Sequence, residues 1–196
     1  QEGAVAAGSA EEEISESINF IRTNVKKMES LIDGLLSLSR VGSDPRTIEP
    51  VNMNQVLDSV RQVLHFQIKS ARAQIKTQPL PSCLADRNHI NQVFCNLIEN
   101  ALKYRHLDRD PEIQISGTDK QGIVEYTITD NGIGIEADKL DRIFGVFVQL
   151  APASGAGGVG LGLTIVKRIL ELCGGTIQVR SQVGTGTTFI IQLPAP

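Results

Sequence analysis

The stretch GAGGVGLGL at residues 155–163 leads directly into an amphipathic segment, and it bears more on the fold than any other part of the chain. Glycines that open a helix form an anion site, because free N–H groups and the helix dipole point at the ligand. A Walker A loop would need lysine in place of Leu161, and a dinucleotide-binding fingerprint would need glycine in place of Leu163 and a preceding strand. The stretch therefore predicts a flexible phosphate-binding loop, with a mobile glycine-rich loop as the alternative.

The segments on either side of this loop predict an α+β protein. Apolar residues at helical spacing indicate helices over residues 53–73 and 86–104 and after residue 163. The expected strands cover residues 74–78, 112–117, 122–129, 176–181 and 187–193. Because these elements lack the regular βαβ spacing of a Rossmann fold, we expect a two-layer α/β sandwich, a mixed sheet with helices on one face. The residues of the first helix that are expected to face inward are Val56, Leu57, Val60, Val63 and Leu64.

Residues 11–41 have a different period. Apolar side chains alternate there at spacings of four and three, which is the seam of a heptad repeat: Ile14, Ile18, Ile21, Val25, Met28, Ile32 and Leu35. A strict seam of this length favours a helix in a four-helix bundle, and a helix that packs only on its own domain is the alternative. The sequence Gly42-Ser43-Asp44-Pro45 is predicted to end this helix. The first ten residues, rich in alanine, glycine and serine, are interpreted as a linker or a remnant of cloning.

One stripe of the helix expected at residues 86–104 is polar. Asn96, Asn100 and Lys103 lie at i, i+4 and i+7 and therefore share one face. Asparagine is a poor helix former, an asparagine carbonyl can ligate Mg²⁺, and lysine can meet phosphates as a mobile charge. A solvated helix face is the alternative. The adjacent Glu99 is expected to point away from this stripe as a solvated residue.

Two shorter motifs follow further along the chain. In DNGIGI at residues 130–135, Asp130 stands at the end of a predicted strand, where its carboxylate could accept a hydrogen bond from an exocyclic amine such as that of adenine. The glycines of this motif let the backbone approach a planar ligand closely, and an ordinary β-turn is the alternative. IFGVF at residues 143–147, taken alone, is predicted to be part of the core.

Four stretches, in this order and spacing, resemble the conserved boxes of histidine kinases. NLIENALKY at residues 96–104, DNGIGI at 130–135, IFGVF at 143–147 and GVGLGL at 158–163 are similar to the N, G1, F and G2 boxes. KYRH at residues 103–106 looks like the group of sensor kinases related to bacterial phytochromes. The resemblance implies the Bergerat fold of the GHKL superfamily, an α/β sandwich shared with gyrase, mismatch-repair and heat-shock chaperone ATPases. It also implies a catalytic ATP-binding domain over residues 53–196, a linker at 43–52 and the second helix of a dimerisation hairpin at 11–42.

The resemblance further implies roles for individual residues, with ATP and Mg²⁺ as the ligands. Asn100 would ligate Mg²⁺, Asn96 and Lys103 would lie beside the phosphates, and Asp130 would bind the adenine amine. The other residues implied in nucleotide binding are Tyr104, Gly132, Gly134, Ile135, Phe147, Gly158, Gly160, Leu161, Gly162 and Leu163.

The phospho-accepting histidine of the family is expected outside this chain. None of His65, His89 and His106 is followed by the Glu-Leu-Arg-x-Pro run typical of acceptors, so we interpret all three as structural or solvated. The general base beside the acceptor is expected outside the chain with it. The implied activity is that of a bacterial two-component protein-histidine kinase, a transferase in phosphorelay signal transduction. The implied partners are a histidine-bearing upstream helix, the receiver domain of a response regulator and a second copy in a homodimer.

Two other functions stay open at this point. Residues 148–157 contain neither lysine nor arginine, which favours a degenerate nucleotide-binding scaffold that signals without phosphoryl transfer. An ATP-hydrolysing clamp of the gyrase type is disfavoured, because Asn96 stands where the related ATPases place a glutamate that activates water.

Composition narrows the class of protein further. The formal net charge is −3 with no block of lysine and arginine, so we expect no nucleic-acid partner. No apolar run approaches the roughly 18 residues that cross a bilayer, and we expect a cytoplasmic location for this portion, with membrane anchoring of the full-length protein left open. The three cysteines, Cys83, Cys95 and Cys173, form no C-x-x-C pair and predict neither zinc nor a disulfide.

Overall fold

The computed structural model of the chain describes residues 2–41, 47–149 and 159–196; up to residue 41 it describes the side chains of residues 15–25, 28–39 and 41. The helices are α1 (Glu2–Arg40), α2 (Met53–Val63), α3 (His65–Ser70), α4 (Arg87–Lys103) and α5 (Gly162–Leu172), with a 3₁₀-helix η1 (Ala137–Arg142). The strands are β1 (Glu49–Val51), β2 (Gln74–Thr77), β3 (Cys83–Ala85), β4 (Glu112–Lys120), β5 (Ile123–Asp130), β6 (Thr176–Gln182) and β7 (Gly186–Pro194).

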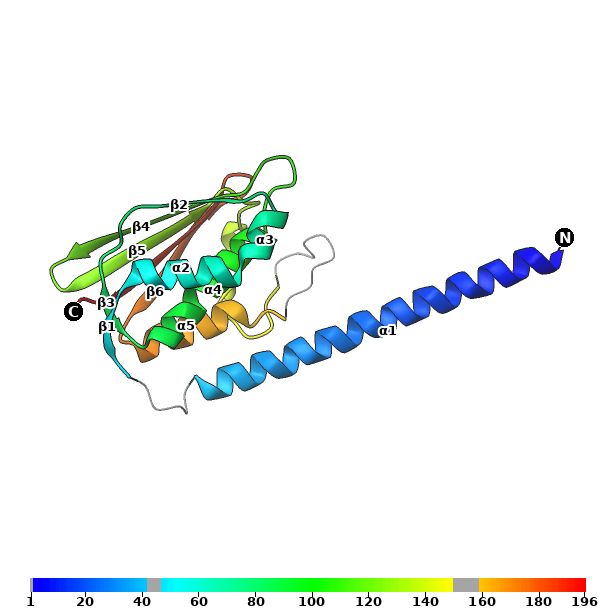
Figure 1. Ribbon diagram of the computed structural model, residues 1–196, viewed down its shortest axis with the longest axis horizontal. Coiled ribbons are helices and arrows are strands. Elements are labelled where there is room, and N and C mark those ends of the chain that lie inside the picture. The colour runs from blue at the N-terminus through cyan, green and yellow to red at the C-terminus, as the bar shows by residue number, and fades with distance from the viewer. Residues whose placement is uncertain (1, 42–46, 150–158) are drawn as a thin grey trace.

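Five strands form one mixed sheet in the order β2-β4-β5-β7-β6, in which β2 pairs with β4 in parallel and the other neighbours pair antiparallel. Along β5, Val124, Tyr126 and Ile128 alternate into the core with the period of two that strand geometry requires. Helices α2, α4 and α5 cover that face of the sheet (Figure 1). The predicted fold class, a mixed sheet with helices on one face, is therefore confirmed.

The helix α4 is the central element of the helical layer. Asp86 caps it as predicted, since its Oδ1 accepts hydrogen bonds from Asn88 N at 2.9 Å and His89 N at 3.1 Å. The helix contacts α2 on one side and α5 on the other. Its buried residues are Ile90, Val93, Phe94, Leu97, Ile98, Ala101 and Leu102. Packing on both sides and on the sheet fixes the orientation of the remaining polar face of α4.

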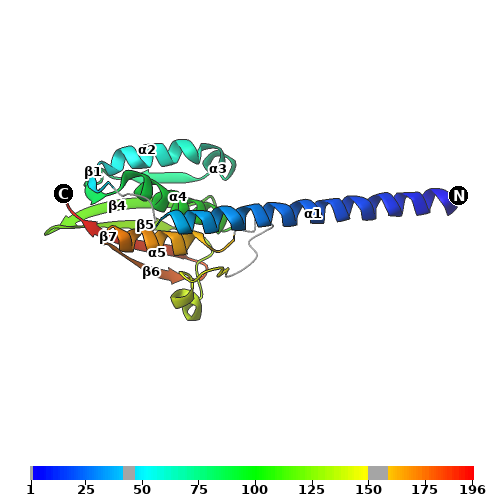
Figure 2. The ribbon, with the colours of Figure 1, turned by 90° about the horizontal axis from the view of Figure 1, so that it is seen from below.

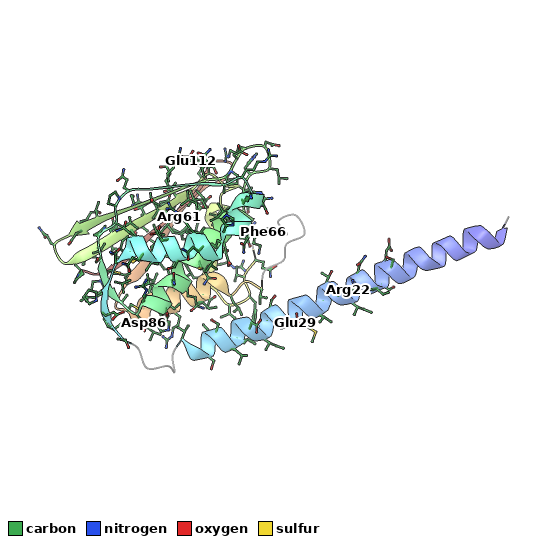
Figure 3. All side chains as sticks on the ribbon, in the orientation of Figure 1. Arg22, Glu29, Arg61, Phe66, Asp86 and Glu112 are labelled. Atoms are coloured by element: carbon green, nitrogen blue, oxygen red, sulfur yellow. The ribbon has the colours of Figure 1, made fainter. Side chains whose placement is uncertain are left out.

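The single helix predicted over residues 53–73 is wrong. The chain forms α2 and α3, separated at Leu64, whose ψ of 9° turns the chain while its side chain remains fully buried. The residues on either side of Leu64 face outward: Val63, predicted to face inward, is 67% exposed, and Phe66 is 77% exposed, whereas Ile68 packs against the core. Phe66 lies at the outer surface of the domain in Figure 3. The two short strands β1 and β3, which pair antiparallel outside the main sheet, were also not predicted.

The helix α1 begins at Glu2, so residues 2–10, interpreted from composition as a linker or a remnant of cloning, are helical. Alanine has the highest helix propensity, which accounts for this extension. Most of α1 runs clear of the rest of the molecule (Figures 1 and 2), and Arg22 projects from this free part (Figure 3). Ile18, Ile21 and Val25 of the predicted seam are 46%, 60% and 48% exposed. No helix in the described part of the chain is both long and apolar enough to cross a membrane.

Candidate nucleotide-binding site

A cavity of about 360 Å³ opens between α4, the segment after β5 and the start of α5. It brings together most of the residues predicted to bind nucleotide. Those that line it are Asn96, Asn100, Lys103, Tyr104, Asp130, Gly134, Ile135, Gly160, Leu161, Gly162 and Leu163. Gly132 and Phe147 do not line it, and Gly158 lies outside the described residues.

The helix α4 supplies the polar wall of the cavity. Asn96 Nδ2 donates a hydrogen bond to Gln92 O at 2.9 Å, and Asn96 Oδ1 lies beside Gly162, where a Cβ atom would be 3.0 Å away. The ammonium group of Lys103 lies 4.9 Å from the centre of the Tyr104 ring, a cation–π arrangement that holds its charge at the cavity. Lys103 is the one cationic side chain among the described residues that line this cavity.

Asp130 ends strand β5 at the cavity. Its Oδ1 accepts hydrogen bonds from Gly132 N at 2.8 Å and from Thr187 N at 3.2 Å. No hydrogen bond to Oδ2 is present within the described part of the chain, so this oxygen is available to a ligand. Burial raises the pKa of the Asp130 carboxyl, and the two amides together with the positive charge of Arg109 oppose that rise. The Asp130 carboxylate is therefore a hydrogen-bond acceptor that is held in position and partly shielded from solvent.

The glycines after Asp130 have two different tasks. Gly134 lines the cavity with a φ of 72°, and a Cβ atom there would collide with the backbone carbonyl of Gln182. Gly132 is buried behind the cavity, where a Cβ atom would lie 2.5 Å from Tyr104 O. Prediction from sequence placed both around the base; Gly132 instead permits close packing of the loop on the end of α4.

The F-box segment lies against the start of α5. Thr164 Oγ1 donates to Phe144 O at 3.1 Å and to Gly145 O at 2.9 Å. Phe147, predicted to bind nucleotide, is 50% exposed and has a φ of 62°. This left-handed residue redirects the chain so that the next residue, Val148, lines the cavity in its place. The backbone at Phe147 and Val148 also abuts Gly160, where a Cβ atom would lie 2.7 Å from Val148 O.

The helix α5 points its N-terminal end at the same cavity. Gly162 and Leu163 line the cavity, and the N-cap residue Leu161 makes no side-chain hydrogen bond to the first turn. Backbone N–H groups of an uncapped first turn, together with the helix dipole, favour an anion. The cavity thus combines the side-chain amides of Asn96 and Asn100, the cation of Lys103, the partly buried carboxylate of Asp130 and the N-terminus of α5.

This arrangement coincides with a family match. Residues 85–196 match the family of histidine kinase-, DNA gyrase B- and HSP90-like ATPases. The chain belongs to this family. The match covers every cavity-lining residue from Asn96 onward, and it confirms the family and the Bergerat-type fold that the four boxes predict.

The relatives that are similar in sequence include cyanobacterial phytochromes. The chain is 33% identical over 184 residues to the phytochrome-like protein Cph1 of Synechocystis, covering 94% of this chain and 24% of that protein. It is 35% identical over 180 residues to cyanobacterial phytochrome A of Nostoc, covering 92% of this chain and 23% of that protein. The chain spans about a quarter of the length of these curated relatives.

Solved structures agree with the sequence relatives. Full-length ShkA in complex with AMPPNP has a TM-score of 0.71 at 28% identity, covering 84% of this chain and 35% of that one. The histidine kinase AdeS of Acinetobacter baumannii has a TM-score of 0.69 at 25% identity, covering 87% and 79%. The chain therefore carries the ATP-binding catalytic domain of sensor histidine kinases, as predicted.

Part of the cavity wall of this ATPase domain comes from outside the four boxes. Ser30 and Gly34 of α1 line the cavity, and Ser37 Oγ accepts a hydrogen bond from Gln92 Nε2 at 2.7 Å. Glu99 is exposed, as predicted for a solvated residue, but it also lines the cavity, where it was not expected, and partial burial raises the pKa of its carboxyl. The spacing of residues within α4 could not reveal that Ser30, Gly34 and Glu99 line the cavity. The C-terminal part of α1 packs beside α4, and the cavity therefore extends beyond the face of α4 that carries Asn96.

Arg109 is a second residue that the sequence did not single out. Its guanidinium donates to Asn131 O at 2.7 Å and to Gly132 O at 2.9 Å, directly after Asp130 in the chain. Arg109 lies in the irregular segment between α4 and β4, outside the motifs quoted above. Its acceptors lie 22 or more positions away, so no local signal in the sequence could have identified this role.

Proposed function

We propose that the chain binds Mg²⁺-ATP in this cavity and acts as the catalytic domain of a sensor histidine kinase that phosphorylates a histidine located outside the chain. The observation that carries this proposal is the Asp130 carboxylate, partly buried, held by two backbone amides and lining the same cavity as Asn100 and Lys103. A carboxylate fixed in this way suits the exocyclic amine of adenine, and a hydrogen bond to a charged group is worth roughly 1.5–3 kcal/mol.

The remaining cavity residues suit a triphosphate. Phosphoryl transfer depends mainly on positioning and on neutralising phosphate charge. Lys103 and the amides at the start of α5 would supply that neutralisation. The Asn100 side chain makes no hydrogen bond within the described residues, so its carbonyl is available for Mg²⁺, which takes few protein ligands besides waters and phosphate oxygens.

Transfer to a histidine is favoured over hydrolysis by Asn96. The amide of Asn96 cannot accept a proton from water, and its Nδ2 is already bonded to Gln92 O. A nucleotide-binding scaffold without transfer is the second candidate, favoured by the single cation among the described lining residues. An ATPase assay separates hydrolysis from both, because hydrolysis alone releases phosphate continuously in the absence of an acceptor.

The exposed seam of α1 suits helical partners. The seam residues Ile18, Ile21 and Val25 are about half exposed on a part of α1 that lies clear of the domain (Figure 1). We propose that this seam packs against a histidine-bearing helix and a second copy in a four-helix bundle, and that the phosphate passes to a response-regulator receiver domain. In sedimentation equilibrium, Ile21→Glu should abolish self-association, whereas Thr23→Glu, which lies off the seam, should leave it unchanged. Equal self-association of the two variants would contradict association through the seam.

The proposal for the nucleotide is tested by calorimetry. ADP and AMPPNP are titrated with and without Mg²⁺ into the chain and into Asp130→Asn, Asn100→Ala and a control, Asn88→Ala, which lies on α4 away from this cavity. We expect Asp130→Asn to weaken binding at least about tenfold. We expect Asn100→Ala to remove the effect of Mg²⁺ and the control to leave binding unchanged. A folded chain that binds nothing at millimolar nucleotide would overturn the proposal in favour of the scaffold.

Transfer is tested separately. A dimerisation hairpin that carries a histidine is added in trans with ATP labelled on the γ-phosphate. Acid-labile label on the hairpin, absent with Asn100→Ala, supports the kinase; nucleotide binding without any label supports the scaffold. Adding a receiver domain should then move the label off the hairpin.

A further inference from the structure

Arg109 joins the two loops that flank Asp130. Its Nε donates to Asn131 O at 2.7 Å, and its Nη2 donates to Gly132 O at 2.9 Å. The same Nη2 reaches across to the turn between β6 and β7, donating to Gly184 O at 2.8 Å and Thr185 O at 3.3 Å. One side chain thus engages four carbonyl oxygens from two segments that lie more than 50 residues apart.

These two segments are the ones that hold the Asp130 carboxylate. Gly132, whose N–H donates to Asp130 Oδ1, belongs to the first segment, and Thr187, whose N–H donates to the same oxygen, lies two residues after Thr185 of the second. The distance between the two donors sets the position of the carboxylate. Arg109 bridges the two segments at their backbone carbonyls, next to the β5–β7 ladder that pairs Asp130 with Thr187, and so adds a second tie between them.

The chemistry of the side chain suits this task. A guanidinium is planar and offers several N–H donors in a rigid fork, so Nε and Nη2 can bind successive carbonyls along one edge. A lysine ammonium could reach some of these oxygens, but as a point charge without the fork. Arg109 does not line the cavity itself. Its influence on a bound nucleotide therefore has to pass through the loops.

Other contacts hold the two loops in part. Gly184 N donates to Ile133 O at 2.8 Å, and Asn131 exchanges hydrogen bonds with Glu112 at 2.8 and 3.2 Å. Strand pairing also holds Thr187 beside Asp130. The loops should therefore stay folded when Arg109 is replaced, while Gly132 loses its tie to the β6–β7 turn. Burial raises the pKa of the Asp130 carboxyl, and the positive charge of Arg109 opposes part of that rise and so favours the ionised acceptor.

We propose that Arg109 is the positioning residue of adenine recognition: it clamps the Asp130 loop to the β6–β7 turn and thereby aims the carboxylate at the exocyclic amine of the base. This inference rests on the proposed role of Asp130. Discrimination between adenine and a purine without the exocyclic amine would then depend on Arg109, although Arg109 does not contact the nucleotide.

The experiment compares two ligands that differ only in that amine. ADP and purine riboside 5′-diphosphate are titrated calorimetrically into the unchanged chain, Arg109→Gln, Arg109→Lys and Asp130→Asn, with Arg87→Gln as a control for loss of one surface charge. The unchanged chain should prefer ADP about tenfold or more, the value of one hydrogen bond to a charged group. Arg109→Gln should reduce this preference to about threefold or less, Arg109→Lys should retain part of it, and Arg87→Gln all of it.

The ratio of the two affinities is the decisive quantity, because general loosening of the site weakens both ligands alike. A preference in Arg109→Gln equal to that of the unchanged chain, while Asp130→Asn loses it, overturns the role of Arg109 and leaves the proposed function intact. A preference that survives in Asp130→Asn overturns adenine recognition by Asp130 and the role of Arg109 together. If Arg109→Gln melts below the assay temperature, Arg109→Lys decides, and an undiminished preference in that variant overturns the proposal.

Discussion

Gly34 of α1 packs against Leu161 so closely that a Cβ atom at Gly34 would lie 2.5 Å from Leu161 Cδ1. Leu161 is 3% exposed and precedes the first residue of α5, so it has little room to yield. Three residues further along α1, Ser37 accepts a hydrogen bond from Gln92, whose carbonyl in turn accepts one from Asn96. The helix α1 is therefore in direct contact with the glycine-rich segment at Leu161, and it is linked to Asn96 through Gln92.

Gly34→Ala should release the end of α1 from the catalytic domain. Alanine raises intrinsic helix stability by about 1 kcal/mol relative to glycine, so in a helix without this contact amide exchange would slow. Because the new methyl group collides with Leu161, we expect the amides of residues 34–41 to exchange faster, by about tenfold. Hydrogen exchange read by mass spectrometry measures this directly.

The matched control for Gly34→Ala is the same substitution in a Leu161→Ala background. Removing the Leu161 side chain makes room, so the helix propensity should decide and Gly34→Ala should now slow exchange. The sign of the effect would then reverse between the two backgrounds. Slower exchange in both backgrounds would show that α1 does not pack on Leu161.

Thr164→Val tests the connection between the F-box and α5. The hydroxyl donates to Phe144 O and Gly145 O, and valine keeps the shape while leaving both carbonyls without this donor. The expected loss is about 1 kcal/mol of unfolding free energy, or a fall of about 2–4 °C in Tm for a chain of this size. Thr164→Ser keeps the donor and should lose clearly less; equal Tm values for the two variants would contradict a role for the hydroxyl.

Gly134→Ala and Gly184→Ala separate backbone strain from collision. The two glycines have nearly the same φ, 72° and 77°, and a left-handed alanine costs about 1–2 kcal/mol at either site. A Cβ atom at Gly184 meets nothing within 4 Å, whereas at Gly134 it collides with Gln182 O. Gly134→Ala should therefore lose about 1–3 kcal/mol more than Gly184→Ala in urea unfolding. Equal losses would mean that the β6–β7 turn moves away freely.

The parts of the fold that the sequence predicts correctly are governed by local patterns. The N-cap Asp86, the shared face of Asn96, Asn100 and Lys103, and the strands around Asp130 each follow from residues within one turn or one strand of each other. The break at Leu64 was not foreseen, because residues 53–73 keep a helical period through it and the turn is set by burial of Leu64.

The parts of the site that the sequence does not predict depend on contacts between distant segments. Gly34 packs against Leu161, and Arg109 donates a hydrogen bond to Gly184 O, but these partners are far apart in the sequence and no periodic pattern links them. Phe147 was predicted to bind nucleotide from its motif, but its left-handed backbone leaves it half exposed and lets Val148 line the cavity. A sequence motif indicates which short segment lies near the ligand. The backbone conformation of that segment then determines which of its side chains lines the cavity.

Asp130→Asn should raise stability and lower nucleotide affinity at the same time. Burial raises the pKa of the Asp130 carboxyl in the folded state, so the folded chain binds its proton more tightly than the unfolded chain does. Keeping the group ionised therefore opposes folding at neutral pH. Asparagine has no such charge, and its Oδ1 can still accept from Gly132 N and Thr187 N. We therefore expect a higher Tm for Asp130→Asn than for the unchanged chain at pH 7.

The pH dependence of this difference identifies its cause. The stability that Asp130 contributes is fully present below the ordinary pKa of an aspartate and is lost as the pH rises through the raised pKa of the folded state. The Tm advantage of Asp130→Asn should therefore shrink as the pH is lowered from 7, and ADP affinity of the unchanged chain should fall over the same interval while that of the variant stays level. Scanning calorimetry and ADP titrations at several pH values measure both. A variant that is less stable than the unchanged chain at pH 7 would show that the two amide donors need the full charge of the carboxylate, and that burial of Asp130 does not oppose folding.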